Sequence, residues 1–366
     1  MVICLSPGGQ PITVGESPRD TLLVGTARGI FSFARQNGSW SAKETLLPGE
    51  HISALLFEPS SRTLFAGTYG EHLYASKDFG RTWERRDRGL GGREIYTLAC
   101  QEAGGQSRIY AGTQPAHLFF SDDLGQSWSE LPGLRRVPGV EKWTFPGPPH
   151  QAHVKSLAFD PRRPDTLYAA VEVGGFLKSE DGGKSWKTVS GLNPDAHRVL
   201  VPLSDPGKVY LVMPTTNSGP TDIAGVCVSR DGGKSWVSLT PRDFRIGYVD
   251  PILVHPHNGS LMFTAGAKTG PGTWRKTHTA DARIARSRDG GKSWEILNEG
   301  FPEHIRGNFE AMSMDVWNSG CALFAGTTDG EVFHSADHGD SWQRIIQGIG
   351  PISKAHHYQN LQASAA

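Results

Sequence analysis

An eight-residue motif, S-x-D-x-G-x-[ST]-W, occurs six times in this chain of 366 residues. The six copies are Ser76–Trp83, Ser121–Trp128, Ser179–Trp186, Ser229–Trp236, Ser287–Trp294 and Ser335–Trp342. A seventh, degenerate copy lacks the aspartate and ends at Trp40, so the motif tryptophans follow one another at intervals of 43 to 58 residues. Repeats of this length are typical of propellers and solenoids, in which each unit buries its apolar face against its neighbours.

Each repeat contains four short apolar runs that turn residues separate. In the second repeat these runs are Ile52–Pro59, Leu64–Thr68, Leu73–Ser76 and a segment that begins at Trp83. Four short antiparallel strands per repeat indicate propeller blades rather than helical units. The chain is therefore predicted to be all-β, a single seven-bladed β-propeller domain over residues 1–366. Its blade repeats end near Trp40, Trp83, Trp128, Trp186, Trp236, Trp294 and Trp342.

Closure of the ring can also be predicted from the ends of the chain. The first blade has no clear inner strand ahead of Leu22, whereas Gly350–Tyr358 follows the last motif at the distance where an inner strand usually starts. We expect this C-terminal segment to supply the inner strand of blade one and so remove exposed sheet edges. Residues Met1–Pro18 would then lie outside that strand or pair beside it.

The motif itself is predicted to form a hairpin turn. Its aspartate can accept backbone N–H groups across the turn, its glycine permits a positive φ, and its tryptophan can pack between blades. The D-x-x-G portion lacks the further acidic ligands and the closing glutamate of a calcium loop. A structural role is therefore expected for all six copies.

The motif resembles the Asp-box, or bacterial neuraminidase repeat, of sialidases, xyloglucan-cleaving propellers, sortilin-type receptors and a photosystem II assembly factor. Segments Lys142–Pro149, His153–Pro161 and Val171–Ser179 are similar to bacterial single-domain Asp-box proteins labelled sialidase-like or glycosyl hydrolase. The resemblance implies the propeller fold and places the motif on the outer rim. Sialidase chemistry is not expected, because the nearest string to the sialidase Arg-Ile-Pro motif, Phe244–Gly247, has glycine where proline belongs.

Composition excludes several classes of function. Lys+Arg and Asp+Glu both number 37, which does not favour a nucleic-acid partner. No apolar run is long enough for a membrane span, and no signal peptide is visible, so a cytoplasmic location is expected, with secretion left open. The four cysteines lack metal-knuckle spacing, and the chain has no P-loop and no dinucleotide fingerprint.

Alignment of the inner strands brings ionisable residues to the mouth of the central tunnel. Such groups gathered in a concave site are functional candidates. The candidate acid–base carboxylates are Glu310, Asp250 and Glu172, with His153, Lys155 and Tyr248 assisting. Glu172 could instead be only a salt-bridge partner of Lys155. Candidate ligand-binding residues on these strands and the neighbouring loops are His51, Glu94, Tyr96, Arg198, Asn308, Arg28, His72 and His117.

Three insertions are predicted to roof this face: Leu131–Gln151, Pro214–Ala224 and Gly266–Arg286. Long loops on a rigid scaffold are often functional. The last is locally basic, which would suit an anionic ligand.

A metal is a separate possibility, since His51, His153, His197 and His357 could approach the tunnel mouth from different blades and bind a divalent ion. No other cofactor is indicated.

Three functions follow from these features. The first is the binding of a small polar or saccharide-like ligand at the tunnel mouth, with hydrolase or lyase activity through acid–base carboxylates. The second is a non-catalytic platform for protein interaction or assembly. The third is a metal-dependent enzyme with a multi-histidine site. Polar inner strands favour the first, because they are of little use to a protein that binds through its rim.

Overall fold

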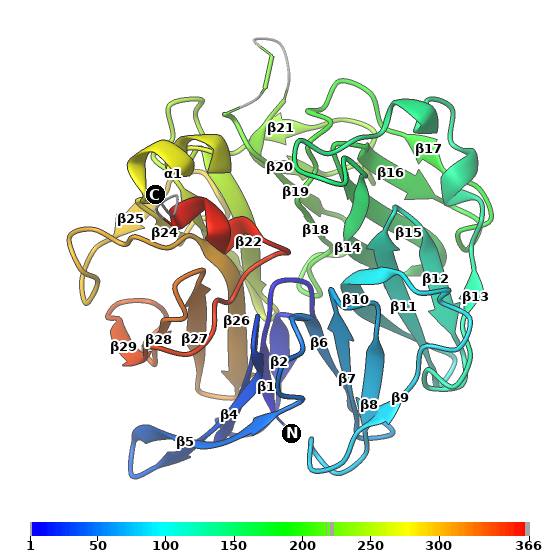
Figure 1. Ribbon diagram of the computed structural model, residues 1–366. Coiled ribbons are helices and arrows are strands. Elements are labelled where there is room, and N and C mark those ends of the chain that lie inside the picture. The colour runs from blue at the N-terminus through cyan, green and yellow to red at the C-terminus, as the bar shows by residue number, and fades with distance from the viewer. Residues whose placement is uncertain (1, 217, 220–222, 363–366) are drawn as a thin grey trace.

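Seven β-sheets are arranged in a ring around a central axis, so that the chain is a seven-bladed β-propeller, as predicted (Figure 1). The computed structural model describes residues 2–216, 218–219 and 223–362. Each blade is a sheet of four strands in chain order from the axis to the rim, and the last blade has one additional strand.

The strands of the first three blades are β1 (Ile3–Leu5), β3 (Thr21–Thr26), β4 (Gly29–Gln36), β5 (Ser39–Leu46); β6 (Ile52–Glu58), β7 (Thr63–Thr68), β8 (Leu73–Ser76), β9 (Glu84–Arg85); and β10 (Glu94–Ala103), β11 (Gln106–Gln114), β12 (Leu118–Ser121), β13 (Ser129–Glu130). Blades four and five are β14 (His153–Asp160), β15 (Arg163–Glu172), β16 (Gly175–Ser179), β17 (Lys187–Thr188); and β18 (Arg198–Leu200), β19 (Val209–Met213), β20 (Gly225–Ser229), β21 (Val237–Ser238). Blade six is β22 (Tyr248–His255), β23 (Asn258–Ala267), β24 (Arg283–Ser287), β25 (Glu295–Leu297). Blade seven is β2 (Ile12–Val14), β26 (Phe309–Trp317), β27 (Gly320–Thr327), β28 (Val332–Ser335), β29 (Gln343–Ile346).

The described ranges contain four short helices outside the sheets: η1 (Leu134–Arg136), η2 (Val140–Lys142) and α1 (Pro271–Thr277) in connections, and η3 (His357–Leu361) in the C-terminal segment. Proline at the start of α1 suits a first helical turn, where its missing N–H would have no partner. No helix in the described part of the chain is long and apolar enough to cross a membrane.

Apolar side chains fill the spaces between adjacent blades. Between blades two and three, Leu56 and Phe65 pack with Leu98 and Trp128, and all four are buried. Burial of apolar surface against the neighbouring sheet is the main favourable term in forming such a ring. The motif tryptophan also contributes a hydrogen bond in this pair of blades, because Trp128 Nε1 donates to the carbonyl of Arg86 at 2.6 Å.

The repeated motif forms the turn that links the third and fourth strands of a blade. In blade six, Asp289 accepts the backbone N–H of Ser293 at 2.9 Å and the Ser293 hydroxyl at 2.6 Å. The Ser287 hydroxyl donates to the same carboxylate and accepts the N–H of Gly291, whose φ of +88° favours glycine. The side chains therefore satisfy the backbone groups of a tight turn, which agrees with the structural role expected from the sequence.

Acid should reduce the stability that the motif aspartates contribute, and substitution of one of them should show this effect. Hydrogen bonds from Ser293 lower the pKa of Asp289 to about 2, below the value of about 3.9 for an unfolded aspartate. The stability that Asp289 contributes is thus fully present above pH 4 and is lost as pH falls toward 2. We expect Asp289→Asn to be less stable than the wild type in urea at pH 6, and the difference to shrink by pH 2.5. A pH-independent difference would contradict this.

The ring is closed by the N-terminal strand, and the prediction that Gly350–Tyr358 supplies the inner strand of blade one is wrong. Strand β1 pairs in parallel with β3, with Ile3 opposite Leu22 and Leu5 opposite Val24. The C-terminal segment instead crosses the face of the ring, where the Pro351 carbonyl accepts the N–H of Ala27 at 2.8 Å. Proline has no N–H to donate, so this segment is a poor closing strand.

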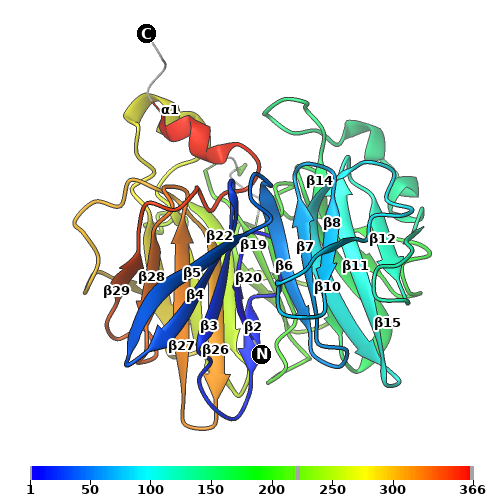
Figure 2. The same cartoon turned by 60° about the horizontal axis from the view of Figure 1, so that its bottom comes forward.

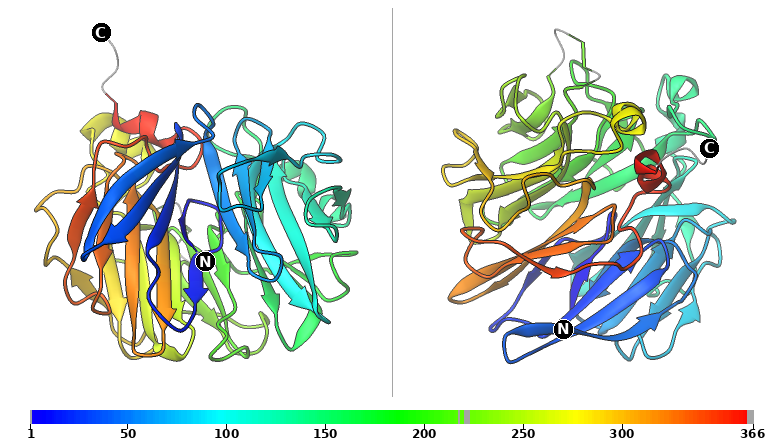
Figure 3. Two further views of the ribbon diagram at one scale, coloured as in Figure 1. Left: turned by 90° about the horizontal axis from the view of Figure 1, so that it is seen from below. Right: turned by 60° about the vertical axis from the view of Figure 1, so that its left-hand side comes forward.

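Residues after β1 enter the ring rather than lying outside it (Figure 3). Gly8 donates to the carbonyl of Ser53 at 2.8 Å and accepts the N–H of Leu98 at 3.1 Å. The chain then reaches blade seven, where β2 pairs in parallel with β26. The N-terminal segment therefore joins the inner strands of blades one, two, three and seven.

Candidate functional site

The inner strands direct side chains into the tunnel through β-bulges. In the inner strands of blades two, three, four, six and seven, the register with the next strand shifts, and at least one residue is left without a partner. These residues include Ser53, Tyr96, Lys155, Asp250 and Glu310. A bulge interrupts the regular alternation of side chains along a strand and so changes the direction in which the bulged side chain points. All five side chains are buried, so blades far apart in sequence contribute to one polar interior.

Asp250 is the shared counterion of three cations in this interior. Lys354 forms an ion pair with its Oδ2 atom, Lys155 Nζ lies 3.5 Å from the same atom, and Arg198 Nε donates to Oδ1 at 2.9 Å. Burial alone would raise the pKa of Asp250, but Lys155, Lys354 and Arg198 hold it far below its usual range. Asp250 is therefore an ionised, fully buried carboxylate.

Glu172, at the end of β15, contacts three basic side chains. Its Oε2 accepts a hydrogen bond from His153 Nε2 at 2.8 Å and lies 2.7 Å from Lys155 Nζ, while its Oε1 lies 3.3 Å from His197 Nε2. Burial opposes ionisation, but Lys155 and Lys354 keep the pKa of Glu172 well below its ordinary value. Burial also lowers the pKa of Lys155, to about 8. The salt bridge between Glu172 and Lys155, which the sequence left as an alternative, is therefore formed.

Glu310 is held by the C-terminal segment that covers the tunnel mouth. Its carboxylate accepts the backbone N–H of Lys354 at 2.6 Å and contacts His357 Nδ1 at 2.8 Å. Asn308, one residue before β26, donates to it at 3.3 Å. Burial would raise the pKa of Glu310, but His357 and Lys354 lower it. Figure 2 shows this segment and α1 on the same face of the ring.

Aromatic rings complete one side of the interior. The Tyr96 ring lies 3.8 Å from that of His153, and Tyr69 packs edge-on against both Tyr96 and His51. His51 Nε2 lies 3.1 Å from the carbonyl of Ser353, and burial lowers the pKa of His51 to about 4. His51 is therefore neutral and can donate to that carbonyl.

A cleft of about 920 Å³ opens above this cluster. Parts of all three predicted insertions line it, together with the C-terminal segment: Phe145–Gly147, Thr216, Thr269–Thr273, Arg275, Lys276, His357 and Asn360. The remaining lining residues are Glu172, Val173, Asn193–Asp195 and Tyr248. Among the predicted acid–base carboxylates, only Glu172 lines the cleft; Asp250 and Glu310 do not. The volume lies within the range of small-molecule sites.

Four predicted ligand-binding residues lie outside this cluster. His117 Nδ1 contacts Glu130 of its own blade at 2.9 Å, and His72 lies 3.7 Å from Asp87 of its own blade. Arg28 is exposed, and Glu94 is half-buried with a pKa that burial raises. None of the four lines the cleft. The other predicted residues, His51, Tyr96, Arg198 and Asn308, belong to the interior described above.

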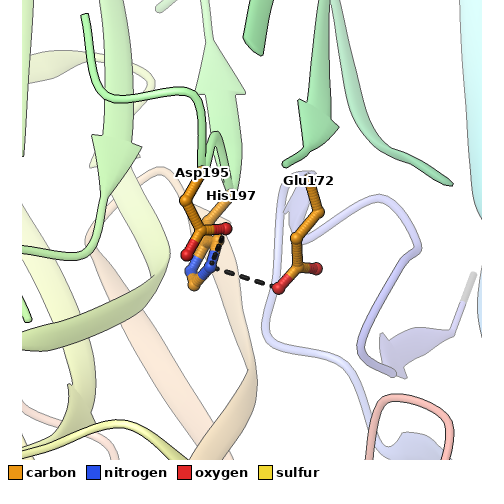
Figure 4. A group of neighbouring side chains, drawn as sticks. All are labelled: Glu172, Asp195 and His197. Atoms are coloured by element: carbon orange, nitrogen blue, oxygen red, sulfur yellow. Dashed lines mark ion pairs between the residues drawn. The ribbon is translucent and has the colours of Figure 1, made fainter. Parts of the chain in front are cut away.

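The four histidines predicted to bind metal do not meet at one point. His51 faces the C-terminal segment, His357 faces Glu310, and His153 and His197 approach Glu172 through different oxygen atoms. In the described part of the chain, the side chains close enough to share an ion are Glu172, Asp195 and His197 (Figure 4).

Sequence reasoning missed Asp195 and Phe145. Asp195 lies in the Asn193-Pro-Asp turn ahead of β18, where Asn193 Oδ1 accepts its backbone N–H at 2.9 Å. Its position two residues before His197 was the available signal. Phe145 lies 5.1 Å from the His153 ring, and its place in a long insertion gave no indication of this contact.

The fold is similar to that of solved propellers. A GH74 xyloglucanase from Xanthomonas campestris matches with 18% identity and a TM-score of 0.67, over 95% of this chain and 56% of its own. A GH74 enzyme from Niastella koreensis matches with 18% identity and a TM-score of 0.63, over 95% of this chain and 55% of its own. YCF48 bound to D1 peptide matches with 13% identity and a TM-score of 0.54, over 94% of this chain and 93% of its own. This chain thus spans just over half the length of the two GH74 structures, and identities this low show the fold alone.

No protein-family model matches the sequence, and no curated protein matches it.

Proposed function

We propose that this propeller is an enzyme that binds a small, hydroxyl-rich molecule, such as a saccharide unit, in the cleft and transforms it by hydrolysis or elimination. One observation carries the proposal: Glu172 belongs both to the buried charged cluster and to the lining of the cleft. Reactive groups within reach of a bound small molecule are the arrangement that an active site requires. A protein that binds its partners through its rim does not need a charged cluster that extends into a cleft.

The lining of the cleft supports a polar and partly anionic ligand. Phe145 and Tyr248 offer aromatic surface, and Thr216 and Thr273 offer hydroxyl groups to a polar ligand. Arg275 is exposed in the same lining and suits a carboxylate or sulfate substituent. The similarity of the fold to the structure of a GH74 xyloglucanase agrees with a saccharide ligand.

Within the cleft, the residues proposed to act on the substrate are Glu172 and Asp195. Both residues line the cleft, and His197 Nε2 lies between their carboxylates, 3.3 Å from the first and 3.2 Å from the second. Carboxylates in this position can accept a proton from a substrate or stabilise positive charge on a sugar ring. Lys155 and His153 hold Glu172 in place from behind.

The proposal predicts a specific loss of turnover in Glu172→Gln. Neutral and acidic oligosaccharides would be incubated with the protein, and products detected by mass spectrometry. For the substrate found, we expect Glu172→Gln to reduce kcat about 100-fold, because a proton-transfer group contributes at least this much. Glu180→Gln is the matched control, since Glu180 pairs with Lys178 at the outer turn of the same blade.

Arg275→Ala, which leaves the buried cluster intact, should weaken an acidic ligand about tenfold and a neutral ligand little. Equal turnover by wild type and Glu172→Gln would refute the assignment of Glu172. If no saccharide bound or reacted, the non-catalytic platform would be favoured instead.

A further inference from the structure

Three side chains at the cleft present ligand atoms to one point. His197 Nε2 lies 3.3 Å from Glu172 Oε1 and 3.2 Å from Asp195 Oδ1, and all three atoms lie within 4.8 Å of one another (Figure 4). They come from different elements, since Glu172 ends β15 whereas Asp195 and His197 precede β18. One imidazole and two carboxylates form a donor set that zinc and manganese accept.

Two of these atoms have no hydrogen-bond partner although they are buried. They are His197 Nε2 and Asp195 Oδ1, and the His197 side chain is fully buried. His197 Nδ1 lies 2.8 Å from the carbonyl of Val249, so Nδ1 carries the proton and donates it there. This hydrogen bond fixes the tautomer that turns the Nε2 lone pair toward the carboxylates, as it does in metal-binding histidines. A lone pair that faces two carboxylate oxygens is repelled by them unless a metal ion or a proton lies between.

Two of the three separations between the ligand atoms match a tetrahedral metal, and the third, between the two carboxylate oxygens, is at most 4.8 Å. Zinc binds imidazole nitrogen at about 2.0–2.1 Å and carboxylate oxygen at about 2.0–2.2 Å, which places neighbouring ligand atoms about 3.3 Å apart. The two measured separations from His197 Nε2 are 3.3 and 3.2 Å. An ion could therefore bind with little movement of the side chains.

The surroundings support the ligands and leave one side open. Glu172 uses its other oxygen, Oε2, for His153 and Lys155, so Oε1 is left to face His197. Lys155 is the nearest opposing cation, but Asp250 lies 3.5 Å from its Nζ and balances its charge. Glu172 and Asp195 both line the cleft, which leaves a further coordination position for water or substrate.

We propose that Glu172, Asp195 and His197 form a binding site for one divalent transition-metal ion, with zinc the best match to the donors and their spacing. The site would deepen the proposed function, because a metal facing the cleft could polarise a substrate oxygen or activate a water molecule. The binding of metal does not itself depend on that function. The competing state is a protonated His197 that forms ion pairs with both carboxylates and leaves no room for an ion.

Metal titration of the full chain tests the site without any substrate. Chelator-treated, tag-free protein would be titrated with zinc by calorimetry and with cobalt by absorption spectroscopy, at pH 7.5. We expect one ion per chain, a dissociation constant in the micromolar range or below, and the visible bands of tetrahedral cobalt. Asp195→Asn should weaken zinc about 100-fold, and His197→Gln should abolish the cobalt bands.

Asp195→Asn is nearly isosteric, so it keeps the test informative should His197→Gln fail to fold. His51→Gln is the control, since His51 faces the C-terminal segment and should leave zinc affinity unchanged. No binding, or binding that survives Asp195→Asn, would overturn the site and favour the ion-paired histidine. Metal binding without conversion of any saccharide would refute only the proposed function. Turnover by the metal-free protein would refute only a catalytic role of the metal.

Discussion

Asp250→Ala should lower the free energy of unfolding by about 3–5 kcal/mol, because it removes one partner of a buried ion-pair network and leaves uncompensated charge behind. The carboxylate is fully buried and serves Lys155, Lys354 and Arg198 at once. A buried cation without a counterion lowers the free energy of unfolding far more than an apolar side chain in the same place does. Urea unfolding at pH 7, with the wild type measured in parallel, gives the difference directly.

Two further variants make this result specific. Asp205→Ala breaks an exposed pair with Lys208, measured at 3.0 Å, and should cost less than about 1 kcal/mol. Adding Lys354→Met to Asp250→Ala removes one of the unpaired charges and should recover part of the loss. A loss below about 1 kcal/mol for Asp250→Ala, with no recovery in the double variant, would mean that water rather than Asp250 balances these cations.

The blades could be predicted because their signals are local. Each motif turn satisfies its own backbone through side chains four residues apart or fewer, as Asp289 does for Ser293. The closing strand could not be predicted on that basis, since β1 has only three residues and pairs in parallel with β3. Its selection depends on the burial of Ile3 and Leu5 between blades, a tertiary effect that overrides the position of the C-terminal segment.

The interior was partly predictable because the same position recurs in each inner strand. Alignment of the repeats singled out Lys155, Asp250 and Glu310, which the structure places at bulges. Their pairings were not predictable, since the partner of each charge depends on how blades far apart in sequence face one another. Asp195 was missed because it precedes an inner strand, in a turn whose geometry is not periodic.

The residues proposed to bind metal from the structure differ from those predicted from the sequence, because the pairings between blades could not be predicted. A count of histidines at the tunnel mouth suggested a site made of imidazoles alone. The structure gives separate partners to His51, His153 and His357, and it leaves only the Nε2 atom of His197 facing two carboxylates. Residue type indicated only a region to search, and the hydrogen-bond partners distinguish a structural histidine from a candidate ligand.

Removal of residues 1–14 should abolish cooperative folding, whereas removal of residues 353–366 should leave the ring folded. Deletion of β1 exposes the edge of β3 and loses the burial of Ile3 and Leu5, each worth about 1.5–3 kcal/mol. The same deletion also breaks backbone hydrogen bonds of Gly8 to blades two and three. Together these losses approach the total stability of a typical protein, which is about 5–15 kcal/mol.

The C-terminal deletion removes Lys354 and His357 but leaves Ile352, which is buried against the first and last blades. Asp250 keeps Lys155 and Arg198, so its charge stays compensated, whereas Glu310 loses Lys354 and His357 and must be hydrated through the uncovered tunnel mouth, which should lower stability without opening the ring. Circular dichroism during heating and size-exclusion chromatography separate the two cases. We expect a sharp transition and a monomer-sized peak for the C-terminal deletion, and aggregation or a broad transition for the N-terminal deletion. The reverse pattern would mean that the C-terminal segment, and not β1, holds the ring together.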